Sequence, residues 1–237
     1  MTKEEFIKEI EKLNIIYTED MLNKLDIYMN YLIEYNTHTN LTAIKNKEDI
    51  YLKHFYDSLT ICKSYDLTKI NNLLDIGTGA GFPGMVIKIF FPNIEVTLLD
   101  SNNKKTKFLE SLTNKLDINV RIINDRVENY SKINLNKFDV VTSRAVANLR
   151  VLSEISLPLV KVGGVFIALK GNIETELKEA EKTIDLMHGK INKNITFELY
   201  NNSGIRNILV IEKIKETNKE EIRSYDKIIK KPLVKKN

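Results

Sequence analysis

Cysteine, proline and long apolar stretches are scarce in this chain of 237 residues, and each shortage excludes a class of protein. The single cysteine, Cys62, can form no internal disulfide and cannot build a metal cluster alone. No apolar stretch reaches the roughly 18–20 residues that a membrane helix needs. Charged residues begin at Lys3 and recur through the first helix, so we expect no apolar region of a signal peptide. We therefore expect a soluble, cytoplasmic protein that binds no membrane.

The charge balance is only mildly basic. Lysine and arginine total 36 against 32 acidic residues, for a net charge of +4, which is compatible with a nucleic-acid partner but does not require one. From Lys227 to Asn237 the chain carries five lysines and no acid. This run is typical of a solvated terminus, and the alternative is a contact with RNA phosphates.

Residues 1–65 have the pattern of helices. Thr2 and Glu5 fit a capping box, Thr18 begins a second periodic segment, and a further helix is predicted from Lys47 to about Ser64. The apolar stripes of these helices predict an N-terminal helical region that packs on the next domain.

Residues 66–212 alternate short β-rich runs with helical segments. Such alternation predicts an α/β domain with a mostly parallel sheet covered on both faces, here of seven strands in a Rossmann-like arrangement. The runs at 195–200 and 207–211 flank a turn at 201–204, which predicts a C-terminal antiparallel hairpin. Residues 213–237 are then expected to form a charged, lysine-rich tail.

The first strand of this domain leads into the glycine-rich segment 75–84, DIGTGAGFPG. Glycines at such a turn allow positive φ and a close approach of the backbone to a ligand. Gly79, Gly81 and Gly84 satisfy G-x-G-x-x-G, the pattern of dinucleotide-binding loops. An NAD(P)-binding oxidoreductase is therefore one interpretation of this loop.

Two features of the same loop favour another cofactor. Asp75 stands two residues before Gly77, where a carboxylate can accept a hydrogen bond from an amino-acid ammonium but would repel a pyrophosphate. Phe82 and Pro83 occupy positions where a pyrophosphate needs open N–H groups. An acid-x-Gly-x-Gly entry resembles the cofactor loop of class I methyltransferases that use S-adenosylmethionine (AdoMet).

Three further strand ends carry candidate ligands. Asp100 ends the second strand, where a carboxylate can accept from both ribose hydroxyls of NAD or AdoMet. After the third strand, Asp125 and Glu128 compete as the acceptor for an adenine amino group, and spacing alone leaves both open. After the fourth, Arg144 is a candidate clamp for a carboxylate or phosphate, with a surface ion pair as the alternative.

Taken together, these motifs resemble the RsmG (GidB) family over about residues 1–212. The segments that carry the resemblance are DIGTGAGFPG at 75–84, LLDS at 98–101, RVE at 126–128, SRA at 143–145, ALKG at 168–171, NLT at 40–42 and HFYDSL at 54–59. The resemblance implies a class I AdoMet-dependent methyltransferase acting on N7 of a guanine, position 527, in 16S ribosomal RNA of the small subunit.

The resemblance also implies particular site residues. Gly77, Phe82, Val127, Glu128 and Arg144 correspond by motif to cofactor contacts, which favours Glu128 as the adenine acceptor. With the strand-end and loop residues above, the full predicted cofactor set is Asp75, Gly77, Gly79, Phe82, Asp100, Val127, Glu128 and Arg144. A non-catalytic AdoMet-binding module that docks on RNA stays as an alternative.

The implied chemistry asks little of side chains. Guanine N7 carries a lone pair and no proton, so the transfer needs alignment and exclusion of water but no catalytic base. Asn40 and Lys170 are the predicted substrate contacts, and His54 and Asp57 lie one helical turn apart, where they can pair. The three histidines are scattered, which predicts no metal site. We expect a monomer.

Overall fold

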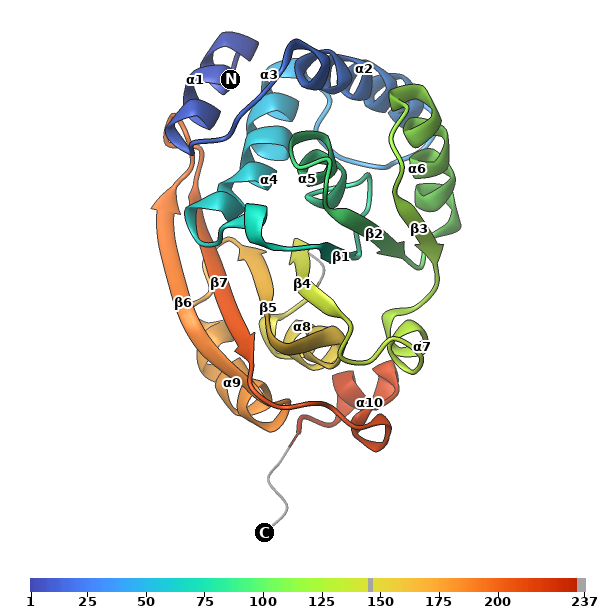
Figure 1. Cartoon of the computed structure of the whole chain (residues 1–237), viewed down its shortest axis with the longest axis vertical. Coiled ribbons are helices and arrows are strands. Elements are labelled where there is room, and N and C mark those ends of the chain that lie inside the picture. Colours follow the sequence, from blue (N-terminus) through green and yellow to red (C-terminus); the bar gives the residue numbers. More distant parts are fainter. Residues whose placement is uncertain (145–146, 234–237) are drawn as a thin grey trace.

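The computed structural model describes residues 1–144 and 147–233 and builds them around one seven-stranded sheet (Figure 1). Its strand order is β3-β2-β1-β4-β5-β7-β6. The strands are β1 (Asn72–Ile76), β2 (Glu95–Asp100), β3 (Arg121–Asn124), β4 (Phe138–Arg144), β5 (Val160–Lys170), β6 (Gly189–Glu198) and β7 (Ile205–Lys213). The predicted mostly parallel sheet with an antiparallel hairpin is confirmed.

The direction of pairing changes once across this sheet. The pairs from β3 to β5 are parallel, whereas β7 is antiparallel to both β5 and β6. Strands β1, β2 and β4 are almost wholly buried because helices cover both of their faces. The chain order reverses between β1 and β4, and the crevice at such a reversal is where doubly wound sheets bind ligands.

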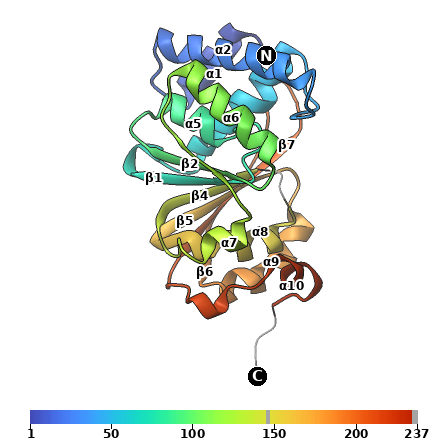
Figure 2. The same ribbon diagram turned by 90° about the vertical axis from the view of Figure 1, so that its right-hand side faces the viewer.

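Helices form a layer on each face of the sheet (Figure 2). The layer of α1, α2, α5 and α6 shares one core with the N-terminal segment, and α8, α9 and α10 pack in a second core. The α-helices are α1 (Lys3–Lys12), α2 (Glu19–Asn36), α3 (Lys47–Ile50), α4 (Asp57–Leu59), α5 (Gly84–Phe90), α6 (Asn103–Leu116), α7 (Val127–Ser131), α8 (Leu149–Ser156), α9 (Glu174–Leu186) and α10 (Tyr225–Lys230). Short 3-10 turns span Thr60–Lys63, Leu67–Lys69, Leu157–Leu159 and Lys219–Glu221.

The N-terminal helices follow the capping signals of the sequence. The Thr2 side chain accepts from the backbone N–H of Glu5, whose own side chain closes the capping box, and Thr18 caps α2. The helix predicted from Lys47 continues to Lys63, but a wider π-helical turn, Tyr51–Tyr56, interrupts it. Such turns often occur at functional sites, and this one carries His54.

The lysine-rich tail is folded as far as it is described. Its helix α10 buries Ile228, whose carbonyl accepts a hydrogen bond from Arg150 of α8 at 3.0 Å. Just before α10, Arg223 forms an ion pair with the buried Glu154. The tail therefore packs on the sheet's second helix layer, and Lys235 and Lys236 of the predicted basic run lie outside the described residues.

Candidate active site

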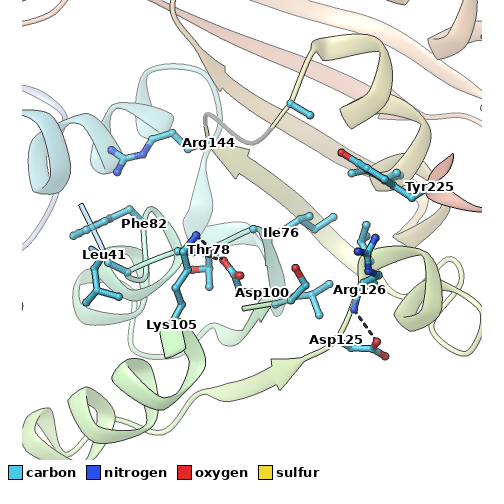
Figure 3. A pocket seen from close by; sticks show the side chains of 18 of the residues that line it. Leu41, Ile76, Thr78, Phe82, Asp100, Lys105, Asp125, Arg126, Arg144 and Tyr225 are labelled. Atoms are coloured by element: carbon cyan, nitrogen blue, oxygen red, sulfur yellow. Dashed lines mark hydrogen bonds and ion pairs between the residues drawn. The ribbon is translucent and has the colours of Figure 1, made fainter. Parts of the chain in front are cut away.

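A cavity of about 550 Å³ opens at the carboxyl ends of β1, β2, β3 and β4 (Figure 3). Its volume is in the range of small-molecule sites. In the order of the chain, the wall is formed by the loops after α2 and β1, the end of β2, the loop after β3, the end of β4 and one residue of α10. The cavity thus lies at the reversal of strand order.

The glycine-rich loop after β1 forms the floor of this cavity. Gly77, Gly79 and Gly81 all have positive φ, at 65°, 63° and 103°, where residues with a side chain are strained. A Cβ added at Gly79 would meet no protein atom nearer than 3.9 Å, so it would extend into open space. At Gly81 it would come within 2.6 Å of the Tyr28 hydroxyl. Gly79 therefore keeps room for a ligand, whereas Gly81 is required for packing.

Asp75 lies beneath the loop and not on the cavity wall. Its side chain is fully buried, and Oδ2 accepts hydrogen bonds from the Thr78 hydroxyl at 2.6 Å and the Gly84 N–H at 2.9 Å. Burial raises the pKa of Asp75 to about 7. The structure thus gives Asp75 a role in holding the loop, and the predicted contact with an ammonium group would need the loop to open.

Asp100 occupies the position predicted for a ribose ligand. Its Oδ2 accepts from the Gly79 N–H and its Oδ1 from the Asn102 N–H, both at 2.9 Å. These bonds fix the carboxylate against the glycine loop, and each oxygen keeps a second lone pair. Lys105 Nζ lies 3.7 Å from Oδ2.

Beyond Asp100, the segment after β3 supplies the two candidates for the adenine acceptor. Oδ1 of Asp125 accepts from the backbone N–H of Arg126 at 2.7 Å and from Asn129 at 3.2 Å, so this carboxylate is engaged at the start of α7 (Figure 3). The side chain of Glu128 is 13% exposed and makes a 3.6 Å ion pair with Arg126. Both residues and Val127 line the cavity, and the local bonds of Asp125 favour Glu128.

Tyr225 is a cavity residue that the sequence analysis missed. It comes from α10, more than 90 residues after Glu128, and lies opposite the segment after β3 (Figure 3). A lone tyrosine among lysines carries no motif, and only the return of the tail to the sheet brings it here. Glu128, Val127 and Tyr225 together define one end of the cavity, which we call the adenine end after the ligand that the sequence predicts there.

The opposite end of the cavity is built around an aromatic stack. Phe82 stacks nearly parallel to two other rings, with its centroid 4.3 Å from that of His54 and 5.3 Å from that of Tyr28. The guanidinium of Arg144 lies over the same Phe82 ring at 5.2 Å. The Tyr28 hydroxyl donates to the Ala80 carbonyl and so ties the stack to the glycine loop. Phe82, His54, Arg144 and Thr42 define the transfer end.

Arg144 joins the N-terminal helices to the sheet. Its Nη1 donates to the Lys53 carbonyl at 2.9 Å and to Oδ2 of Asp57 at 3.2 Å, and its Nη2 lies 3.1 Å from Nδ1 of His54. Oδ1 of Asp57 accepts from Arg206 at 2.8 Å. The predicted pairing of His54 with Asp57 is wrong, because each bonds to Arg144 instead. Ala145, which follows in the SRA motif, lies outside the described residues.

The two predicted substrate residues are not in this cavity. Asn40 is exposed, although its neighbours Leu41 and Thr42 line the cavity wall. Lys170 lines an adjoining cavity of about 450 Å³, which shares His54 and Arg144 with the first. Its Nζ is held by the Ala147 carbonyl and by Glu176, both at 2.8 Å. In residues 1–144 and 147–233, no cluster of three or more potential ligands could hold a metal ion.

Comparison with known proteins identifies the family. The model of GidB, described as rRNA small subunit methyltransferase G, matches residues 21–229. The chain belongs to the GidB family. Ribosomal RNA small subunit methyltransferase G of Streptococcus pyogenes is 42% identical to it, and that of Lachnoclostridium phytofermentans is 41% identical. The alignments span 98% of this chain and 100% and 97% of those proteins.

Solved methyltransferase structures share the fold of this GidB protein. A SAM-dependent methyltransferase from Aquifex aeolicus has a TM-score of 0.53 and 17% identity, covering 73% of this chain and 97% of that one. M. jannaschii TYW2 in complex with AdoMet has a TM-score of 0.50 and 14% identity, covering 62% and 70%. Family and fold make the chain an AdoMet-dependent methyltransferase, in place of the oxidoreductase and non-catalytic interpretations.

The cavity fits AdoMet in its own geometry. The space above Gly79 is open, and the fixed carboxylate of Asp100 has free lone pairs for ribose hydroxyls. Val127 and Glu128 offer an apolar surface and an acceptor for adenine.

No helix among the described residues is long and apolar enough to cross a membrane.

Proposed function

We propose that this GidB protein methylates N7 of a guanine in 16S ribosomal RNA of the small subunit, at position 527 as the family resemblance implies. Among the residues that the structure describes at the transfer end, no side chain offers the cavity a free proton acceptor, and this observation carries the proposal. The ring of His54 is bonded at both nitrogens, and Asp57, which bonds to Arg144 and Arg206, is not on the wall of this cavity. Such an end suits an acceptor atom that has no proton to lose.

The charge state of His54 supports the same chemistry. Burial, and then the neighbouring Arg144, lower the pKa of His54 to about 3, so its ring is neutral at physiological pH. A ring that accepts from Arg144 on one nitrogen and bonds to Thr42 on the other has no free lone pair for a substrate proton. We infer that it orients its neighbours and does not act as a base.

The chain then has to bind and align its two substrates. AdoMet supplies an electrophilic methyl on its sulfonium. Asp100 and Glu128 would hold the ribose and adenine, and Phe82, fixed by Tyr28 and His54, would form an apolar wall that excludes water from the reacting atoms. Methylation gives the guanine a positive charge, which the nearby Arg144 cation would repel. The carboxylate of Asp57, paired with Arg144, reduces that repulsion.

Mapping the methylated nucleotide tests the proposal. Small-subunit RNA is incubated with enzyme and AdoMet, and borohydride and aniline then cleave the chain at N7-methylguanine. We expect cleavage at one guanine, and incorporated methyl groups without such cleavage would contradict the proposal. Gly79→Ala is the control, since its Cβ would extend into the cofactor space with no protein atom nearer than 3.9 Å, and chemical denaturation checks that the strain at its positive φ leaves the protein folded.

The pH dependence of the chemical step gives a second test. Because N7 needs no base and His54 stays neutral, single-turnover rates should be flat between about pH 6 and pH 9 in Asp75→Asn, which removes the titration of Asp75 near pH 7 beneath the loop. A titration within that range that disappears in His54→Gln would show that His54 acts as a base.

The proposed substrate also implies a location. The protein would act in the cytoplasm, where small ribosomal subunits are found.

A further inference from the structure

Thr42 lies at the transfer end on a loop whose backbone is fixed. Oδ1 of Asn36, the last residue of α2, accepts from the Leu41 N–H at 2.8 Å and from the Thr42 N–H at 3.1 Å. Its Nδ2 donates to the Thr42 carbonyl at 2.8 Å. Both Leu41 and Thr42 line the cavity, and Figure 3 shows Leu41 close to Phe82. The position of the Thr42 hydroxyl is therefore set before any ligand binds.

The direction of each hydrogen bond near Thr42 follows from Arg144. A guanidinium only donates, so Nδ1 of His54, 3.1 Å from Nη2, must accept. In the neutral ring the proton is then on Nε2, which donates to Oγ1 of Thr42 at 2.9 Å. The Ile44 N–H donates to the same oxygen at 3.1 Å. Both lone pairs of the hydroxyl are thus used.

The hydroxyl proton of Thr42 remains available. With both of its lone pairs occupied, Thr42 can only donate, and residues 1–144 and 147–233 offer no acceptor for that proton. Two neighbours thus turn an ordinary hydroxyl, which can donate or accept, into a fixed donor on a residue that lines the cavity.

The same end of the cavity is where the transferred methyl belongs. With adenine at Glu128 and ribose at Asp100, the rest of the cofactor would lie over the glycine loop, and Phe82 and Arg144 would line the space at its far end. An acceptor base must approach from that side, next to Thr42. On guanine, N7 and O6 are neighbouring acceptors on one edge, whereas adenine carries a donating amino group in place of O6.

We propose that the Thr42 hydroxyl donates to O6 of the target guanine and so selects guanine over adenine; this rests on the proposed guanine-N7 activity. Arg144 and His54 are positioning residues, because they set the direction of the Thr42 hydroxyl without touching the base. Adenine would bring its amino group against a second donor, and this mismatch would leave both groups without an acceptor.

A cycle of one protein change and one base change tests the contact. Wild-type enzyme and Thr42→Val act on small-subunit RNA that carries either guanine or 2-aminopurine, which lacks O6 but retains N7, at the target position. On guanine we expect Thr42→Val to lower kcat/KM by about 10- to 100-fold with unchanged AdoMet affinity. On 2-aminopurine the wild type should be slow and Thr42→Val no slower.

Two companion variants separate this contact from a structural effect. Thr42→Ser keeps the hydroxyl and should restore most of the activity, and Thr37→Val makes the same change at an exposed position of the same loop region. An equal loss from Thr42→Val on both bases, or a Thr42→Ser enzyme as slow as Thr42→Val, would overturn the proposal. If wild-type enzyme leaves guanine N7 unmethylated, the proposed function fails instead, whatever Thr42 does.

Nitrogen NMR of the His54 ring tests the bond directions without any activity. Full-length protein labelled at histidine should show the tautomer protonated at Nε2 at neutral pH. The tautomer protonated at Nδ1 would make Thr42 the donor to His54 and would overturn the assignment of a free hydroxyl proton.

Discussion

The two ends of the cofactor cavity are built in different ways. At the adenine end, Val127 and Glu128 come from one short segment after β3, and the neighbouring Arg126 side chain is 63% exposed. At the transfer end, Arg144 is 14% exposed and its partner Asp57 only 8%. Both ends join distant parts of the chain, but the ion pair of Glu128 has an exposed partner, whereas Arg144 lies in a buried network of hydrogen bonds.

This difference separates binding from alignment. At the adenine end, loss of the 3.6 Å ion pair between Glu128 and the exposed Arg126 should disturb the core little. The transfer end couples the N-terminal helices to the sheet through Arg144, so a change there alters the geometry of transfer and the stability of the fold together. Substitutions at the two ends should therefore have different signatures.

Arg144→Met should give the largest effect. It removes the donors to Asp57, His54 and the Lys53 carbonyl, and we expect turnover to fall by at least 100-fold and the free energy of unfolding by about 3 kcal/mol. Single-turnover kinetics and chemical denaturation measure the two quantities. Arg126→Met is the control, because its exposed ion pair contributes little. Similar losses in both variants would break the comparison between the ends.

Asp75→Asn should change how stability depends on pH. The folded pKa of Asp75, about 7, exceeds the ordinary value of 3.8, so the folded protein binds the extra proton between these values and loses stability as pH rises. From pH 5 to pH 7 this contribution is roughly 2–3 kcal/mol. Denaturation at several pH values should show that fall in the wild type and a flatter profile in Asp75→Asn. Parallel profiles would refute a protonated Asp75 beneath the loop.

Tyr225→Ala should weaken the adenine end alone. Loss of an aromatic wall of the cavity is expected to cost about 1 kcal/mol, a roughly five-fold rise in the AdoMet Kd measured by calorimetry, with turnover at saturating AdoMet unchanged. Tyr225→Phe should bind like the wild type. Ile229→Ala, at an exposed position of the same helix, controls for damage to α10. A fall in turnover at saturation would show that the two ends are not independent.

Removing charge from the tail should have the smallest effect. The triple variant of Lys227, Lys230 and Lys231 to glutamine removes three exposed charges beside Tyr225 and leaves the buried Ile228 in place. If the lysines contact phosphates, the slope of log affinity for RNA against log salt becomes shallower by up to about 2, independently of base sequence. An unchanged slope would identify the tail as a solvated surface.

Much of the architecture could be predicted from local patterns. The alternation of strands and helices predicted the parallel sheet, and the Asn201–Gly204 turn predicted the hairpin of β6 and β7, because periodicity and turn chemistry act over few residues. The glycine loop and Asp100 were placed correctly at the cavity, since the ends of parallel strands meet at one edge.

The errors and omissions have one physical origin. The spacing of His54 and Asp57 predicted a pair, but Arg144 offers both of them a charged donor that no local pattern reveals. The lysine-rich tail gave no sign of α10 or of Tyr225 in the cavity, because what holds α10 is the burial of Ile228 against α8. Asn40 is exposed and lies outside the cavity that Thr42 lines, and its contact with the substrate stays a prediction.

By itself, the sequence determined the parallel sheet, the positive-φ glycines and the carboxylates at the strand ends, because each depends on a few neighbouring residues. Only the tertiary structure decided which way Asp75 faces, that Arg144 bonds to His54, and that Tyr225 closes the adenine end. Those outcomes depend on burial and on hydrogen-bond partners up to 90 residues apart in the chain. In a buried network the available donor, and not spacing in the sequence, fixes what each side chain can do.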